Sequence, residues 1–228
     1  MVDLRDDLNA QPLNLIAIAD DDVVYRFALK QLIPAIKQSR LIIDSSNGQE
    51  LVEKIESSKI KPSICLLDTG MPIMNGFATL PVLKEKWPSL KIIITANNSS
   101  KFSINSMLIN GADGYILKTD SLANLENIFN AIGQQGVYYS SQAPKTLFEK
   151  AKEGSLTVPE ITDREMEALT FICNNLSYEQ IAQKMSISRR TVEVHRDNLY
   201  KKLQVSNKLE LLRFALQNEL ILLNTGSK

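Results

Sequence analysis

Polar side chains with the potential for chemistry end several short apolar segments in the first 120 residues. Asp20–Asp22 follow the segment LIAIA, and Asp68 ends SICLLD. Thr95 ends KIIIT, and Lys118 ends GYILK. A core strand has no use for an ionised side chain, because burying an unpaired charge is costly. Residues of these types at the ends of strand-like segments therefore indicate a site.

The same residue types are those that a phosphoryl-accepting site needs. Carboxylates that lie close together repel one another and require a cation to stay ionised. Their oxygen ligands suit a hard cation such as Mg²⁺, while a lysine and a threonine hydroxyl can stabilise phosphoryl oxygens. One carboxylate can then attack phosphorus as a nucleophile. We therefore interpret Asp68 as a phosphate acceptor that works with Mg²⁺.

Strand-like and helix-like segments alternate through this part of the chain. Nearly continuous apolar runs, typical of strands buried on both faces, occupy residues 15–19, 40–44, 63–68, 91–95 and 114–118. Segments long enough for helices occupy residues 22–37, 48–57, 76–86, 99–110 and 121–134. This order predicts an α/β doubly wound, five-stranded parallel sheet with helices on both faces. Ligands bind such sheets at the carboxyl ends of the strands, which is where the candidate site residues lie.

The pattern changes after residue 140. Residues 140–157 have the composition of a linker with some helical content, and no strand pattern follows them. We then expect an all-α domain of four short helices. Residues typical of helix N-caps are Thr162, Ser177, Ser188 and Asn207, and Thr162 and Asn207 each precede a Glu by three residues, as in a capping box. The predicted domains span residues 12–139 and 158–223.

Composition excludes several classes of protein. The 228 residues are 44% apolar and 23% charged, with a formal net charge of zero, as in an ordinary globular protein. No apolar run approaches the roughly 20 residues of a membrane helix, and the N-terminal MVDLRDDLNAQP has no signal-peptide core. We expect a cytoplasmic protein with no membrane partner. Cys65 and Cys173 lie in separate apolar stretches, so we expect core thiols in a reducing compartment.

As a set, the motifs resemble those of two-component response regulators. The segments that resemble a receiver domain, which has a flavodoxin-like fold, are DDD (20–22), DTGMPIMNG (68–76), TA (95–96) and GADGYILK (111–118). The segment from ITDREMEAL to SNKLEL resembles the helix-turn-helix of the NarL/FixJ/LuxR group. Together the resemblances cover residues 14–139 and 158–223, which is nearly the whole chain.

The resemblance implies that Asp68 takes a phosphoryl group from a sensor histidine kinase. The implied ligands of Mg²⁺ are Asp20, Asp21, Asp68 and the backbone carbonyl of Gly70. Lys118 would pair with phosphoryl oxygens. Thr95 would hydrogen-bond the phosphoryl group and move inward, which would let Tyr115 change rotamer. This motion would reshape the face made by the fourth helix, the fifth strand and the fifth helix.

Three consecutive aspartates leave two registers for the metal site, Asp20–Asp21 or Asp21–Asp22. We expect the first register, because the strand LIAIA directly precedes Asp20. Asp22 would then cap the following helix, where a carboxylate is favourable.

Residues 188–203, SRRTVEVHRDNLYKKL, form the expected DNA-reading helix, the second helix of a tight pair that can enter a major groove. Helical spacing places Val192, Leu199 and Leu203 on the buried side. Expected contacts to DNA phosphates come from Arg189, Arg190, Thr191, Lys201 and Lys202. Expected contacts to base edges come from Glu193, Val194 and Asp197. The two acidic readers repel phosphate, so we expect double-stranded DNA to be bound by a homodimer when the protein is active.

Two other functions stay open. An unphosphorylated regulator could use the same fold as a constitutive interaction platform, and Asp68→Asn would then bind DNA as the unaltered protein does. An enzyme such as a phosphohydrolase is disfavoured, because the sequence has no P-loop and no Gly-rich dinucleotide turn. Our interpretation is a DNA-binding regulator of transcription that is not an enzyme.

Overall fold

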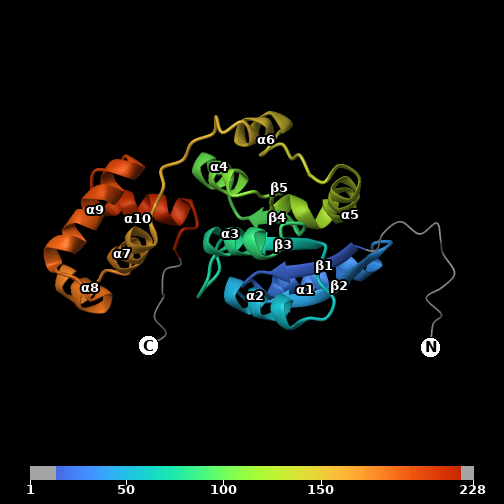
Figure 1. The fold of residues 1–228 in the computed structure, drawn as a ribbon, viewed down its shortest axis with the longest axis horizontal. Helices are drawn as coiled ribbons and strands as arrows, with labels where there is room; N and C mark the ends of the chain where they lie inside the picture. The colour runs from blue at the N-terminus through green and yellow to red at the C-terminus, as the bar shows by residue number, and fades with distance from the viewer. Residues whose placement is uncertain (1–13, 222–228) are drawn as a thin grey trace.

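A computed structural model describes residues 14–221 (Figure 1). The described residues do not include the N-terminal segment MVDLRDDLNAQP. They also do not include the outermost residues of the two predicted domains, 12–13 and 222–223. The strands are β1 (Asn14–Ala19), β2 (Ser39–Ser45), β3 (Ile64–Asp68), β4 (Lys91–Ala96) and β5 (Gly114–Leu117). The helices among and directly after them are α1 (Val23–Leu32), α2 (Gly48–Ser57), α3 (Gly76–Lys86), α4 (Lys101–Ile109) and α5 (Lys118–Gln135).

The five strands form one parallel sheet in the order β2-β1-β3-β4-β5. The predicted doubly wound sheet is confirmed. In the register of β3 and β4, Asp68 pairs with Thr95. Because all strands run in one direction, their carboxyl ends meet at one edge of the sheet, and the polar residues that follow them are brought together there.

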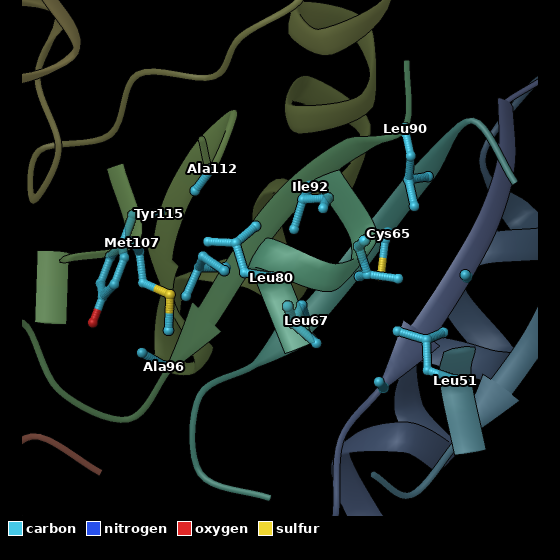
Figure 2. Packing of buried hydrophobic residues seen from close by; sticks show 14 of the residues in the cluster. Leu51, Cys65, Leu67, Leu80, Leu90, Ile92, Ala96, Met107, Ala112 and Tyr115 are labelled. Atoms are coloured by element: carbon cyan, nitrogen blue, oxygen red, sulfur yellow. The ribbon is translucent and has the colours of Figure 1, made fainter. Parts of the chain in front are cut away.

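Two apolar clusters cover the two faces of the sheet. Side chains from α2, α3 and α4 pack on one face, and side chains from α1 and α5 pack on the other. Successive residues of a strand point to opposite faces, so Leu66 belongs to one cluster and Leu67 to the other. Figure 2 shows Leu67 with Leu80 of α3 and Met107 of α4 in the first cluster. Burial on both faces explains why the strands are apolar without alternation.

The first helix is shorter than expected. The sequence pattern suggested a helix over 22–37, but α1 ends at Leu32 and a short 3₁₀ helix, Ile33–Ala35, follows it. Pro34 accounts for the difference. Its nitrogen has no hydrogen to donate, and its ring crowds the carbonyl of Lys30, so the α-helix cannot continue through it.

The second domain consists of α7 (Asp163–Cys173), α8 (Tyr178–Met185), α9 (Arg189–Leu203) and α10 (Lys208–Gln217), as predicted. All four expected N-cap side chains accept a hydrogen bond from the first turn of their helix. Thr162 and Glu165 form a complete capping box. At α10 the reciprocal bond differs, because Glu210 accepts from the amide of Ser206, 2.7 Å away, and not from that of Asn207.

The linker contains a helix that packs against the first domain. This helix, α6 (Lys145–Lys152), lies over α4 (Figure 1). Phe148 is buried in the same apolar cluster as Met107 and Tyr115, and its ring meets that of Tyr139 edge-on at 5.2 Å. The linker therefore covers part of the surface formed by α4 and β5.

Across residues 14–221, every helix is too short or too polar to cross a lipid bilayer. Cys65 and Cys173 are both buried and free of disulfide bonds, and they lie in separate apolar clusters.

Candidate functional site

Three carboxylates meet at the carboxyl edge of the sheet. Asp20 follows β1 and Asp68 ends β3, and each can place a carboxylate oxygen within 4.8 Å of the others and of Asp21. Asp20 and Asp68 are buried, with exposed fractions of 2% and 1%, whereas Asp21 is exposed. Asp22 has a different task, because its side chain accepts hydrogen bonds of 2.8 and 3.1 Å from amides in the first turn of α1. This arrangement favours the Asp20–Asp21 register.

Lys118 supplies the positive charge of the site. It is the first residue of α5, directly after β5, and its side chain is 10% exposed. Its Nζ lies 2.8 Å from Asp20 Oδ2 and 3.0 Å from Asp68 Oδ1. It also lies 5.1 Å from the centre of the Tyr25 ring. One ammonium therefore faces two buried carboxylates, and the site has an excess of negative charge when both are ionised.

Burial and, to a smaller extent, the excess negative charge alter the ionisation of the site. Burial raises the pKa of Asp68 to about 7, the Asp20 carboxylate adds to this, and Lys118 opposes it. Burial likewise raises the pKa of Asp20. Burial alone would lower the pKa of Lys118, but the two carboxylates outweigh it and raise that pKa to about 12.

The donor atoms fit a hard cation. Apart from the ion pairs with Lys118, the buried oxygens Asp20 Oδ2 and Asp68 Oδ1 accept no hydrogen bond within the described residues. A cation beside them would offset repulsion that a single ammonium leaves uncompensated. Two or three carboxylates with room for water are the usual set for Mg²⁺. Asp20, Asp21 and Asp68 are therefore suited to hold it.

The loop after β3 explains the segment DTGMPIMNG. The Gly70 amide donates to Asp68 Oδ2 at 3.2 Å, which helps to orient the carboxylate. Asn75 caps α3. Gly76 packs so closely against the end of β3 that a Cβ there would lie 2.3 Å from the Asp68 carbonyl oxygen, so only glycine fits. The loop thus returns to the strand that carries Asp68.

Thr95 and Tyr115 lie on the two strands that follow β3 in the sheet. Thr95 is buried and is the neighbour of Asp68 across the sheet. Tyr115 is fully buried beside Met107 (Figure 2), and its hydroxyl donates to the Asn98 carbonyl at 2.9 Å. Its own carbonyl accepts from the hydroxyl of Ser140 in the linker. Tyr115 therefore connects the loop after β4 with the linker.

One residue at the mouth of this site was missed by sequence reasoning. Glu219, just beyond α10, accepts a hydrogen bond from the Asn97 amide at 3.1 Å and another from the Thr69 hydroxyl. Thr69 is 150 residues away in the chain, and no motif or spacing links the two. The missed contact also brings a further negative charge close enough to raise the pKa of Asp68.

The second candidate site is the outer face of α9. Val192, Leu199 and Leu203 are buried, as the helical spacing predicts. Val194 is 49% exposed on the opposite side. An open surface concavity there is lined by Arg189, Arg190, Glu193, Val194 and Asp197. The structure thus brings the expected base readers and two of the expected phosphate contacts onto one accessible face.

Several residues of α9 already have partners in the domain. Arg189 pairs with Glu179 at 2.6 Å and with Glu193 at 3.1 Å. Lys202 pairs at 2.7 Å with Glu165, which is buried. The hydroxyl of Thr191 lies 2.8 Å from that of Ser188, and Asp197 pairs with Arg196 at 2.6 Å.

Arg190 and Lys201 are exposed and have no side-chain partner within residues 14–221. Of the expected phosphate contacts, these two are the most available. Lys202 is the least available, because its departure would leave the buried Glu165 carboxylate without a counter-charge and with only its hydrogen bonds from Thr162.

Both halves of the chain match known families. The family described as the response regulator receiver domain matches residues 16–130, and that described as bacterial regulatory proteins, luxR family, matches residues 159–215. The nitrate/nitrite response regulator protein NarL of Escherichia coli K12 is 30% identical over 206 residues, which cover 89% of this chain and 94% of NarL. The transcriptional regulatory protein YdfI of Bacillus subtilis is 30% identical over 213 residues, which cover 92% of this chain and 98% of YdfI.

A solved structure has the same fold over most of the chain. RcsB of Salmonella enterica serovar Typhimurium, bound to promoter rprA in the presence of the phosphomimetic BeF3-, aligns with a TM-score of 0.63 at 22% identity. The alignment covers 89% of this chain and 98% of the RcsB chain. At this identity the likeness concerns the fold alone.

Proposed function

Because the chain belongs to the response regulators that join a receiver domain to a LuxR-type DNA-binding domain, we propose that phosphorylation of Asp68 controls its action on transcription. The observation that carries the proposal is the buried Asp68 carboxylate, which lies beside Lys118 and within reach of two further aspartates. A sensor histidine kinase supplies the phosphoryl group, and the exposed face of α9 binds double-stranded DNA.

The residues at the sheet edge have distinct roles in phosphoryl transfer. An Asp68 oxygen attacks phosphorus, the bond from phosphorus to the kinase imidazole nitrogen breaks, and the imidazole keeps the electron pair and is protonated. Lys118 pairs with a phosphoryl oxygen, and the Thr95 hydroxyl donates to another. Asp20, Asp21, Asp68 and the Gly70 carbonyl would hold Mg²⁺, which would supply positive charge for the phosphoryl oxygens.

Phosphorylation acts on the rest of the protein through the α4–β5 surface. A hydrogen bond to the phosphoryl group draws Thr95 inward and opens space for the Tyr115 ring. The Tyr115 carbonyl accepts a hydrogen bond from Ser140 of the linker, and α6 packs over the same surface. Movement of Tyr115 therefore disturbs the packing of the linker. We propose that the exposed surface then pairs with a second copy of the chain, which places two α9 helices on DNA.

The first test is the intact mass of the full-length protein after incubation with acetyl phosphate and Mg²⁺. We expect a gain of one phosphoryl group, and no gain when EDTA replaces Mg²⁺. The phosphorylated protein should also bind DNA more tightly and form dimers in sedimentation. Equal DNA binding with and without phosphorylation would favour the constitutive interaction platform.

Replacing an unpartnered basic residue of α9 should weaken binding to DNA by a similar factor whatever the base sequence of the duplex. For Lys201→Ala we expect lower affinity for every duplex tested, because one phosphate contact is lost, and a slope of log K against log salt that is smaller by about 1. Fluorescence anisotropy at several salt concentrations measures both. Lys150→Ala, which removes an exposed lysine from α6, is the matched control. An unchanged salt slope for Lys201→Ala would place this residue off the DNA.

A further inference from the structure

The C-terminal end of α10 docks directly on the mouth of the phosphoacceptor site. Figure 1 shows α10 on the side of the helical domain that faces the sheet. Asn218 bonds to Ser100 and, through its carbonyl, to the Ser103 hydroxyl at 3.1 Å. The Leu220 carbonyl accepts from Asn75 Nδ2 at 3.3 Å. These contacts come from Asn75 in the loop after β3, and from Ser100 and Ser103 at the start of α4, which follows the loop after β4. The two loops follow Asp68 and Thr95. The docking therefore covers the edge of the sheet where the phosphoryl group would arrive.

Glu219 lies at the centre of this contact. One carboxylate oxygen accepts from the Asn97 amide at 3.1 Å, and the other accepts from the Thr69 hydroxyl. Its side chain also passes Gly70 closely, since a Cβ added to Gly70 would lie 3.6 Å from Glu219 Cβ. Thr69 and Gly70 directly follow Asp68, so the glutamate satisfies donors that lie directly around the acceptor.

The backbone of Glu219 is in a conformation that glutamate adopts rarely. Its φ is 54°, in the left-handed region. Glu219 and Leu220 end α10 by donating to the carbonyls of Leu216 and Ala215, which is the Schellman pattern. Glycine is the usual residue at this position, because it has no Cβ to strain. The helices α8 and α9 also end at non-glycine residues in this conformation, Ser186 and Gln204, so the turn fixes the position of Glu219 while the contacts of its side chain carry the argument.

The docking leaves the DNA-reading face open. Across the interface the helical domain offers the end of α10, where the Phe214 ring meets that of Phe102 edge-on at 5.3 Å. Val194 stays 49% exposed on α9. Within the described residues, the group covered by the docking is therefore the phosphoacceptor and not the reading helix.

We propose that Glu219 is an internal anion that guards Asp68: it holds the helical domain over the acceptor and must leave before phosphoryl transfer. This inference rests on the proposed function. A phosphoryl group brings roughly −1.5 to −2 charges and three acceptor oxygens to the space beside Glu219. The two anions repel each other and compete for the same donors. Phosphorylation and domain docking therefore exclude each other.

The exclusion works in both directions, because a coupling free energy between two sites is reciprocal. Phosphorylation of Asp68 releases the helical domain. Equally, anything that pulls the helical domain away, such as DNA that requires a different domain arrangement, frees Asp68 for its phosphodonor. The rate of phosphorylation then reports how often the two domains are apart.

The test compares initial rates of phosphorylation of full-length proteins by acetyl phosphate and Mg²⁺, followed by intact mass. Glu219→Gln keeps the shape and removes the charge, and Glu219→Gly removes the side chain while suiting the left-handed backbone. We expect both to be phosphorylated about tenfold faster than the unaltered protein, within the usual range of coupling between sites. Glu126→Gln, an exposed glutamate on α5, is the matched control and should leave the rate unchanged.

Hydrogen exchange gives a second readout that does not depend on phosphorylation. The Asn97 amide should exchange faster in both Glu219 variants than in the control, because its acceptor is weakened or lost. Equal phosphorylation rates in all proteins, or faster exchange without faster phosphorylation, would overturn the guarding role and leave the proposed function intact. No phosphoryl gain in any of them would overturn the proposed function and the guarding role with it.

Discussion

Asp68→Asn is expected to abolish phosphoryl gain and, at the same time, to stabilise the metal-free protein. The first effect follows because an amide is not a nucleophile that accepts a phosphoryl group. The second follows from the burial of the Asp68 carboxylate and from its repulsion by Asp20, with which it shares the ammonium of Lys118. Asparagine at position 68 leaves one carboxylate opposite one ammonium, which is a neutral pair.

The pKa of Asp68 sets the size and the pH range of this stabilisation. The pKa is about 7 in the folded protein against an ordinary value of 3.8, so the folded state binds the proton more tightly. The contribution of Asp68 to stability is therefore greatest below pH 4, falls as the pH rises, and is lost above about pH 7. The difference between these pKa values corresponds to about 4 kcal/mol at pH 8. We expect Asp68→Asn to increase the free energy of unfolding at pH 8 by about 2–4 kcal/mol. The gain does not exceed the full difference, because burying the amide of asparagine also costs free energy.

Urea denaturation in EDTA at pH 4 and pH 8 measures the effect. The free energy of unfolding of Asp68→Asn should exceed that of the unaltered protein at pH 8 and approach it at pH 4. Mg²⁺ should stabilise the unaltered protein more than the variant, because it binds the folded site. A variant that is less stable than the unaltered protein at pH 8 would mean that Asp68 contributes favourable contacts that outweigh its charge. A phosphoryl gain retained by the variant would place the acceptor elsewhere.

Lys118→Met is expected to have the opposite effect on stability. Methionine has a similar length and no charge, so Asp20 and Asp68 would remain buried without a counter-ion. Removing one partner of a buried ion pair costs about 3–5 kcal/mol. The loss should be large at pH 8 and smaller at pH 4, where the two carboxyl groups, whose pKa values are raised, take up protons. Phosphorylation should also slow, since the phosphoryl oxygens lose their lysine.

Denaturation of Lys118→Met at both pH values, beside Lys145→Met, tests this prediction. The Lys145 side chain is 68% exposed and lies 3.7 Å from Glu149, so its replacement should change stability by less than about 1 kcal/mol. A variant at Lys118 that is destabilised equally at pH 4 and pH 8 would show that packing, and not charge, explains the loss. If stability were unchanged at pH 8, the ion pairs at the sheet edge would not be formed in solution.

Together the two variants separate the effect of the site residues on phosphorylation from their effect on the free energy of unfolding. We expect Asp68 to lower the stability of the metal-free protein above about pH 7, and Lys118 to offset part of that loss. Glu219 adds another negative charge at the mouth of the same site. This excess of negative charge suits the site to take up a cation, which would replace repulsion with paired charges.

The sequence alone determined the local structure and the place of the acidic site. Continuous apolar strands with helices between them required a parallel sheet, and the carboxyl ends of parallel strands lie at one edge, so Asp20, Asp68 and Lys118 had to be close. The N-caps at Ser188 and Asn207 were equally predictable, because they depend on residues within one turn of each other. Such features follow from short-range periodicity and from the direction of the strands.

The tertiary structure decided what depends on how separate surfaces meet. Glu219 contacts Thr69, which is 150 residues away in the chain, and Lys202 pairs with Glu165. Phe148 of the linker joins the core cluster that contains Tyr115. Helical spacing gives the side of a helix that is buried, but it does not identify the surface that buries it. Contacts between domains depend on the fit of two finished surfaces, and no spacing within either segment encodes that fit.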